Sequence, residues 1–202
     1  ASHPTIESQA KLLQDLGYAG ISPHYTGPEP MAQMLQELDR NDLQAFAVYT
    51  GINIDPGARA HDPTLNEGMK VLAGRNAILW IFAQSKQHKP SDAAGDARAV
   101  EILRTLADTA ALHRVRIALY PHNGFWLETV EDAVRIAEKV NRPNVGVTFN
   151  LCHWLRVSRD RNVRTVLEKA MPRLFVVSIN GADTDGKDWK TLIQTLDRGT
   201  FD

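Results

Sequence analysis

The sequence has a single cysteine, Cys152, among its 202 residues. One thiol excludes an intrachain disulfide and a four-cysteine zinc site. An excess of charge of either sign is also missing, because 23 Lys and Arg stand against 24 Asp and Glu, for a formal net charge of −1. A balanced charge gives no general attraction for nucleic acid or for an anionic membrane surface, so we expect neither as a partner.

Long apolar runs are absent as well. The longest covers residues 77–83, far short of the about 20 residues that a membrane-spanning helix needs. There is no signal-peptide pattern and no initiator Met, so a cytoplasmic location is the default expectation and an exported mature chain stays open. Hydrophobic residues make up 43%, which is enough for a core, and no linker is visible. We expect one domain over residues 1–202.

Short apolar segments alternate with segments of helical periodicity along the chain. Near-continuous apolar runs of this length are typical of parallel strands that are covered on both faces. The predicted strands cover residues 19–22, 44–49, 77–83, 115–120, 145–149 and 174–179. Apolar residues at helical spacing predict helices around residues 6–16, 100–110, 127–137 and 163–170.

End signals support these helices. Gly17 stands where a C-terminal cap glycine is expected, and Thr129 with Asp132 has the spacing of a capping box. Pro143 and Pro172 are placed to close the third and fourth helices.

Strands that alternate with helices predict an α/β fold with a parallel sheet. The strand spacing fits a (β/α)8 TIM barrel, which takes about 250 residues, so the barrel is expected to be incomplete. About six strands are visible, and we expect the first and last strands of the barrel to be missing. An open doubly wound sheet is the alternative, weakened because no glycine-rich phosphate loop follows the first strand.

Polar side chains follow the predicted strands. In a parallel barrel the chemistry lies at the carboxyl ends of the strands, where such groups converge on a ligand of the size of a sugar. Polar residues at loop ends are common in any protein, so their concentration on one face is the stronger signal. The residues at these ends are His24, Tyr25, Tyr49, Asn53, Asp55, Gln84, Tyr120, His122, Asn123, Asn150, His153, Ser178, Asn180 and Asp183.

Two of these strand ends carry a resemblance to a known family. The segments Tyr-Pro-His-Asn-Gly at 120–124 and Val-Thr-Phe-Asn-Leu-Cys-His at 147–153 resemble the ends of strands five and six in the xylose-isomerase-like TIM-barrel superfamily. Residues 16–21 are similar to its first helix leading into strand two, and residues 196–202 to the element before strand eight. The superfamily includes sugar isomerases, ketose epimerases, dehydratases and zinc-dependent DNA-repair nucleases.

The resemblance implies a divalent metal, Mn, Mg or Zn, held by carboxylates and a histidine at the strand ends. Here the matching positions read Tyr120, Asn150 and Ser178, none of which is a carboxylate or an imidazole. Because hard and borderline cations prefer those groups, we expect no metal at these positions. A displaced site built from His122, His153 and Asp183 stays open.

The resemblance and the strand-end rule together assign the working residues. His122, His153 and Tyr120 are the candidate catalytic residues, because imidazole transfers protons near neutral pH. Each histidine has a structural alternative, His153 as a packed core residue and His122 as one that orders a loop. The candidate substrate-binding residues are Asn150, His24, Gln84, Ser178 and Asn180.

Four neighbouring residues carry weaker expectations. Phe125, Trp126 and Trp154 are either a stacking surface for a sugar or packing between barrel and helices. Cys152 is expected to be inert, since no basic side chain adjoins it in sequence except His153.

The function that these residues favour is sugar isomerisation or epimerisation, by proton abstraction next to a carbonyl to give an enediol. A keto-sugar lyase or dehydratase begins with the same step and stays open. So does a non-catalytic barrel that binds a sugar or a partner protein after losing its metal site. A DNA-repair nuclease is disfavoured, because it needs a multi-zinc cluster and attraction for phosphate. The expected partner is a small carbohydrate, and a homo-oligomer is left open.

Overall fold

A computed structural model describes residues 5–158 and 162–202. Its strands form a parallel sheet. They are β1 (Gly20–Ile21), β2 (Gln44–Ala45), β3 (Ala47–Asn53), β4 (Ile78–Gln84), β5 (Arg116–Leu119), β6 (Val145–Asn150) and β7 (Leu174–Ser178).

Every neighbouring pair of strands is parallel, in the order β1–β2 and β3–β4–β5–β6–β7. The strands β2 and β3 correspond to one predicted strand, interrupted at Phe46. That interruption is local, because the Phe46 N–H donates to Ile21 and its carbonyl accepts from Ile78. All six predicted strands are therefore present, and the α/β class is confirmed.

The helices are α1 (Ile6–Asp15), α2 (Pro28–Arg40), α3 (Leu65–Leu72), α4 (Asp96–Leu112), α5 (Val130–Val140), α6 (Leu151–Val157), α7 (Val163–Ala170) and α8 (Trp189–Leu192). The four predicted helices correspond to α1, α4, α5 and α7. Gly17 follows α1 with a φ of 77°, as expected at a helix C-terminus. The prediction missed α2, α3, α6 and α8, and of these α6 matters most, because it begins directly after β6.

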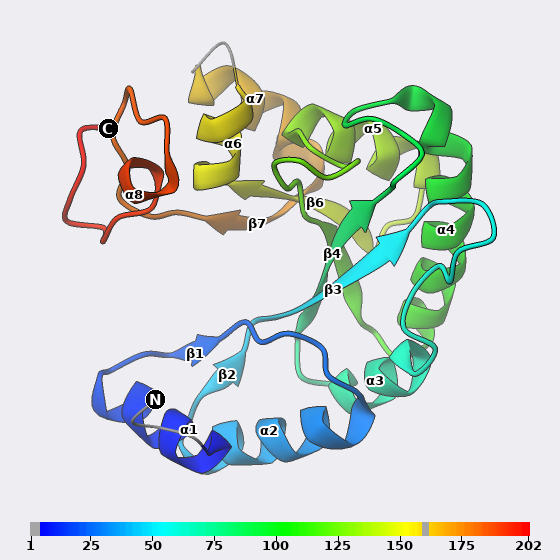
Figure 1. The fold of residues 1–202 in the computed structure, drawn as a ribbon. Coiled ribbons are helices and arrows are strands. Elements are labelled where there is room, and N and C mark those ends of the chain that lie inside the picture. Colours follow the sequence, from blue (N-terminus) through cyan, green and yellow to red (C-terminus); the bar gives the residue numbers. More distant parts are fainter. Residues whose placement is uncertain (1–4, 159–161) are drawn as a thin grey trace.

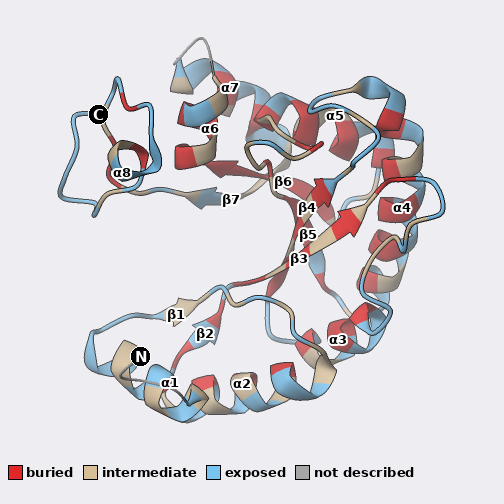
Figure 2. Cartoon of the chain, in the orientation of Figure 1, coloured by how far each residue is buried: buried red, intermediate tan, exposed pale blue. Residues whose placement is uncertain are grey.

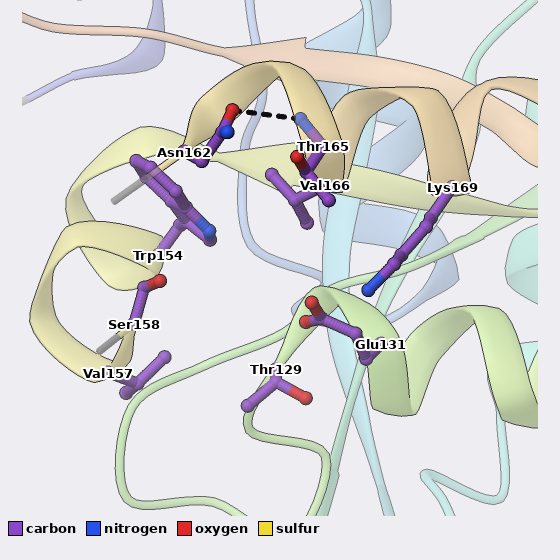
Figure 3. A pocket seen from close by; sticks show the side chains of 9 residues that line it. All are labelled: Thr129, Glu131, Trp154, Val157, Ser158, Asn162, Thr165, Val166 and Lys169. Atoms are coloured by element: carbon purple, nitrogen blue, oxygen red, sulfur yellow. Dashed lines mark hydrogen bonds between the residues drawn. The ribbon is translucent and has the colours of Figure 1, made fainter. Parts of the chain in front are cut away.

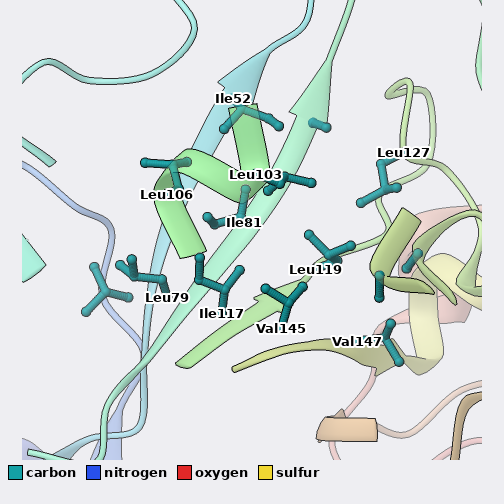
Figure 4. Close-up of a cluster of buried hydrophobic side chains, with 14 of the residues drawn as sticks. Ile52, Leu79, Ile81, Leu103, Leu106, Ile117, Leu119, Leu127, Val145 and Val147 are labelled. Atoms are coloured by element: carbon teal, nitrogen blue, oxygen red, sulfur yellow. The ribbon is translucent and has the colours of Figure 1, made fainter. Parts of the chain in front are cut away.

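The sheet curves into an arc, and all the helices except α8 lie on its convex side; α8 lies near the C-terminus, beyond the end of β7 (Figure 1). Buried residues gather between the sheet and these helices (Figure 2). Figure 4 shows this layer, in which branched aliphatic side chains from the strands meet Leu103 and Leu106 of α4. The labelled strand residues are Ile52, Leu79, Ile81, Ile117, Leu119, Val145 and Val147.

Alternation along the strands gives the sheet two different faces. In β4, Leu79, Ile81 and Ala83 are buried toward the helices, whereas Trp80 and Phe82 are half-buried on the opposite, concave face. Successive side chains of a strand point to opposite faces, so the aliphatic residues build the core and the aromatic ones line the inside of the arc.

The arc is open on one side. Within the described residues, β1 and β7 each pair with a strand along one edge alone, and the two edges face each other across the opening (Figure 1). This is the partial barrel that the strand count predicted.

A buried network fixes α5 against α4. Thr129 and Asp132 form the predicted capping box, and Asp132 is also the acceptor for Ser91 Oγ at 2.5 Å. Arg135 bridges Asp132 to Asp96, both of which are buried. Both carboxylates are paired and hydrogen-bonded, so the network fixes the start of α5. It therefore also fixes the end of the preceding β5–α5 loop, residues 120–129.

We expect Thr129→Ala to lower the free energy of unfolding by about 1 kcal/mol, the usual cost of losing a helix N-cap. Thr5→Ala, which breaks the exposed capping box of α1, is the matched control and should cost less. Urea unfolding of both variants measures the difference. Equal and negligible losses would contradict the importance given to the α5 cap.

Candidate functional site

Two histidines meet at the carboxyl ends of adjacent strands. His122 follows β5, and His153 lies in the first turn of α6, just after β6. Their ring centroids are 4.1 Å apart, and the Tyr120 ring lies 5.7 Å from that of His153. The structure thus brings the three candidate catalytic residues together on the concave side. It also places His153 on a helix, which the sequence did not predict.

Asn150 connects these residues. Its Oδ1 accepts the His153 backbone N–H at 3.2 Å and so caps α6, while its Nδ2 donates to the Tyr120 hydroxyl at 2.8 Å. The Cys152 thiol also donates to Oδ1, at 3.1 Å. The side chain expected to bind a substrate hydroxyl is therefore used mainly to position Tyr120 and His153.

The backbone of Asn123 contacts both imidazoles. Its carbonyl accepts a hydrogen bond from His122 Nδ1 at 2.8 Å. Its N–H donates to His153 Nδ1 at 3.4 Å. One peptide segment of the β5–α5 loop thereby contacts both rings and restrains how they are turned.

Aromatic rings surround the pair. Phe125 stacks on His122 with a centroid distance of 3.9 Å, and Phe82 lies 5.2 Å from Phe125. Tyr49 packs between Phe82 and Tyr120, and Trp189 of α8 lies 5.6 Å from His153. A wall of this kind suits the apolar face of a ring-shaped polar ligand.

Small residues make room for these rings. Gly51 is the register partner of Phe82, and a Cβ at Gly51 would lie 2.3 Å from the Phe82 ring. Lower in the arc, Trp80 Nε1 donates to Thr148 Oγ1 at 2.6 Å, passing over Ala118 of the intervening strand β5. The concave face therefore carries aromatic side chains that are held by close packing and by a hydrogen bond.

Burial shifts the pKa values of the site in the directions that favour the neutral form of each side chain. It lowers the pKa of His153 to about 4, with a further contribution from nearby His122, and burial also lowers the pKa of His122. Burial raises the pKa of Tyr49 to about 12 and raises that of Tyr120. Both imidazoles are consequently neutral at pH 7 and both phenols are protonated.

The remaining expected binding residues are spread more widely. His24 packs edge-on against Tyr49 at 5.0 Å, one ring away from Tyr120. Ser178 is the register partner of Asn150, and Gln84 lines a cavity of about 330 Å³ together with Phe82. Asn180 is tied elsewhere, because its Nδ2 donates to the carbonyls of Gly181 and Leu192.

The aromatic alternatives are resolved by burial. Phe125 belongs to the site, whereas Trp126 and Trp154 are core residues that are 1% and 4% exposed. Cys152 is buried and its pKa is raised, as expected of an unreactive thiol. Trp80, Phe82 and Trp189 were missed. For Trp80 and Phe82 the signal was present, since they alternate with aliphatic residues in one strand.

A cavity of about 360 Å³ lies apart from these rings, on the helical side of the molecule between α5, α6 and α7 (Figure 3). Its lining includes Glu131 and Lys169, and Asn162 there caps α7 through Thr165. None of the candidate catalytic residues lines it.

The residues at the family's metal positions do not fit a divalent ion. Tyr120 is a protonated phenol that accepts from Asn150, and Asn150 Oδ1 already accepts two hydrogen bonds. Across residues 5–158 and 162–202, no three His, Cys, Asp or Glu side chains are grouped to hold a metal. The displaced site of His122, His153 and Asp183 is therefore not formed. Asp183 instead lines a surface pocket with Asp185 and Asp188.

Comparison with known families matches residues 10–202 to the family described as xylose isomerase-like TIM barrel. The chain belongs to this family. No curated protein matches it. In the described part of the chain, no helix has the length and apolar character needed to cross a membrane.

Solved structures show the same fold at low identity. The 3-keto-D-glucoside 4-epimerase YcjR from E. coli matches with a TM-score of 0.71 and 16% identity, over 90% of this chain and 75% of that one. A D-allulose 3-epimerase from Methylomonas sp. in complex with D-allulose gives 0.69 and 18%, over 91% and 69%. A family member from Mycobacterium smegmatis in complex with magnesium gives 0.66 and 17%, over 89% and 68%.

Burial lowers the pKa of His153 to about 4, whereas the pKa of a free histidine is about 6.5, so the unfolded chain binds more protons between these two pH values. The free energy of unfolding should therefore fall as the pH is lowered from about 6.5 to 4. The His153→Asn variant lacks this contribution, so its free energy of unfolding should fall less steeply as the pH is lowered. Urea unfolding at several pH values measures the difference. His113→Asn, at the end of α4, is the control for losing an imidazole. An unchanged slope in His153→Asn would contradict the assignment.

We also expect no divalent ion bridging Tyr120, Asn150 and Ser178. Elemental analysis after incubation with Zn or Mn and desalting should find far less than one ion per chain. Near-stoichiometric metal that disappears in Asn150→Ala would overturn this expectation.

Proposed function

We propose that this protein acts on a carbohydrate by removing a proton from the carbon next to a carbonyl, in the manner of a sugar isomerase or epimerase. The observation that carries the proposal is the close pair of neutral histidines at the carboxyl ends of β5 and β6, backed by Tyr120. In a parallel barrel this is where chemistry occurs.

The environment of the pair supports proton transfer. An unprotonated imidazole is available as a base at neutral pH, and a neutral N–H or phenol hydroxyl donates to the oxygen on which negative charge develops. The aromatic wall of Phe82, Phe125 and Trp189 offers a stacking surface on which a sugar ring is held. Sugar epimerases among the structural neighbours favour the same class of substrate.

The chemistry proposed relies on side chains of this chain alone. A divalent ion would stabilise an enediolate strongly, but the residues at the family's positions do not fit one. Hydrogen-bond donors replace that effect only where water is excluded and the donors are held in place. The bonds from Asn150 and Asn123 provide this positioning.

A sugar-binding protein without turnover is the second candidate. It is favoured by one observation, namely that neutral Tyr120 and Asn150 stand where the family's carboxylates are expected. Sugar binding by calorimetry without conversion of the same sugar would select it.

The test is turnover of D-fructose and D-allulose by the purified protein, with and without EDTA. We expect His153→Asn to reduce turnover by about 10²-fold or more, as loss of a positioned acid or base does, with little change in melting temperature. His113→Asn is the matched control and should keep activity.

Two outcomes would contradict the catalytic assignment. Equal turnover in His153→Asn and the parent protein would remove His153 from the reaction. A loss of about 1–3 kcal/mol in the free energy of unfolding at neutral pH would instead mark His153 as a structural residue whose partners are left unpaired.

A further inference from the structure

The peptide groups of Asn123 hold the two histidines in opposite tautomers. A carbonyl oxygen only accepts, so the 2.8 Å contact from Asn123 O requires a hydrogen on His122 Nδ1. A backbone N–H only donates, so its 3.4 Å contact requires a bare Nδ1 on His153. In a neutral imidazole one nitrogen carries the hydrogen, which leaves His122 Nε2 bare and His153 Nε2 protonated.

We infer from this polarity that His122 is the base, that His153 is the hydrogen-bond donor, and that the pair works on a single face of the substrate. The inference rests on the proposed function. It assigns different roles to two side chains of the same type, which differ only in their hydrogen bonds to Asn123. Asn123 is then a positioning residue that acts through its main chain.

Neighbouring contacts hold each ring in place. The Phe125 ring covers one face of His122 at an interplanar angle of 16°. His153 is placed by the α6 cap through Asn150 and lies edge-on to both Tyr120 and Trp189. A ring that is packed and hydrogen-bonded in this way does not exchange its roles by rotating.

The separation of the rings decides the stereochemical class. Inverting a carbon with two groups needs one on each face of a planar enediol, with reacting atoms about 3–3.5 Å away on either side, or about 6–7 Å in all. The ring centroids of His122 and His153 are 4.1 Å apart, and the two residues follow adjacent strands. The rings therefore lie side by side, without the space for a planar substrate between them. The pair therefore favours proton transfer between neighbouring carbons over inversion of one carbon.

The reaction balances without a further reactant. His122 Nε2 takes the proton from the carbon, and the C–H electron pair forms the C=C bond of the enediol. The carbonyl π electrons move to oxygen, which takes the Nε2 proton of His153. That ring is left as an imidazolate, to whose Nδ1 the Asn123 N–H donates, and its negative charge balances the positive charge on protonated His122. The adjacent hydroxyl then returns its proton to His153 Nε2 as it becomes the new carbonyl, and His122 delivers its proton to the former carbonyl carbon. The product is the aldose or ketose isomer, and both imidazoles end in their starting tautomers.

Nitrogen NMR tests the tautomers without any turnover. Long-range proton–nitrogen correlation of the uniformly ¹⁵N-labelled protein at pH 7.5 distinguishes the Nδ1–H from the Nε2–H form. His122→Asn and His153→Asn assign the signals, with His122→Gln and His153→Gln in reserve if either variant fails to fold. We expect the Nδ1–H form for His122 and the Nε2–H form for His153. The same tautomer on both rings, or the reverse pattern, overturns the assignment.

D-Fructose tests the facial argument, because one substrate separates the two outcomes. Transfer between C1 and C2 gives D-glucose or D-mannose, whereas inversion at C3 gives D-allulose. An aldose product supports the inference, and D-allulose as the main product overturns it. If D-fructose is not converted, the proposed function is contradicted for this sugar, and the tautomer measurement still decides the roles of the two rings.

Discussion

The side-chain amide of Asn150 joins the end of β6, the start of α6 and the hydroxyl of Tyr120 on the neighbouring strand. Without it, the helix would lose the acceptor that fixes its first turn, and His153 lies in that turn. The same amide fixes the hydroxyl of Tyr120, whose ring packs between those of Trp80 and His153. A carboxylate at this position could accept the helix N–H but could not donate to a tyrosine hydroxyl, so the neutral amide suits a site assembled from hydrogen bonds.

The two faces of the sheet carry different kinds of side chain, and this difference explains why such a site is stable. Aliphatic side chains on the convex face pack into a continuous core with the helices and supply most of the apolar burial. The concave face is left free to carry rings and polar groups. Its contacts are specific hydrogen bonds, such as Trp80 to Thr148, which fix geometry more than they add stability.

Strand positions were predictable because near-continuous apolar runs have few alternatives in an alternating α/β sequence. All six were found, whereas α6 was missed because no loop precedes it and its start is marked only by Asn150. The meeting of His122 and His153 followed from the rule for strand ends. The sequence did not show which polar side chains form hydrogen bonds within the protein and are therefore not free to bind a ligand. Asn150 and Asn180 both read as ligand-binding amides, yet both are occupied by the protein itself. Trp189 lies far along the chain, and only tertiary packing brings it to His153.

The fit of Phe82 over Gly51 carries a consequence for how this sequence can diverge. A Cβ at position 51 would lie 2.3 Å from the Phe82 ring, so any larger residue there requires the ring to move or to be replaced. The two positions are 31 apart along the chain yet constrain each other as a unit. A branch of the family with a residue larger than glycine at position 51 should therefore have displaced or replaced the aromatic residue at 82, and with it changed the contact to Phe125 beside His122.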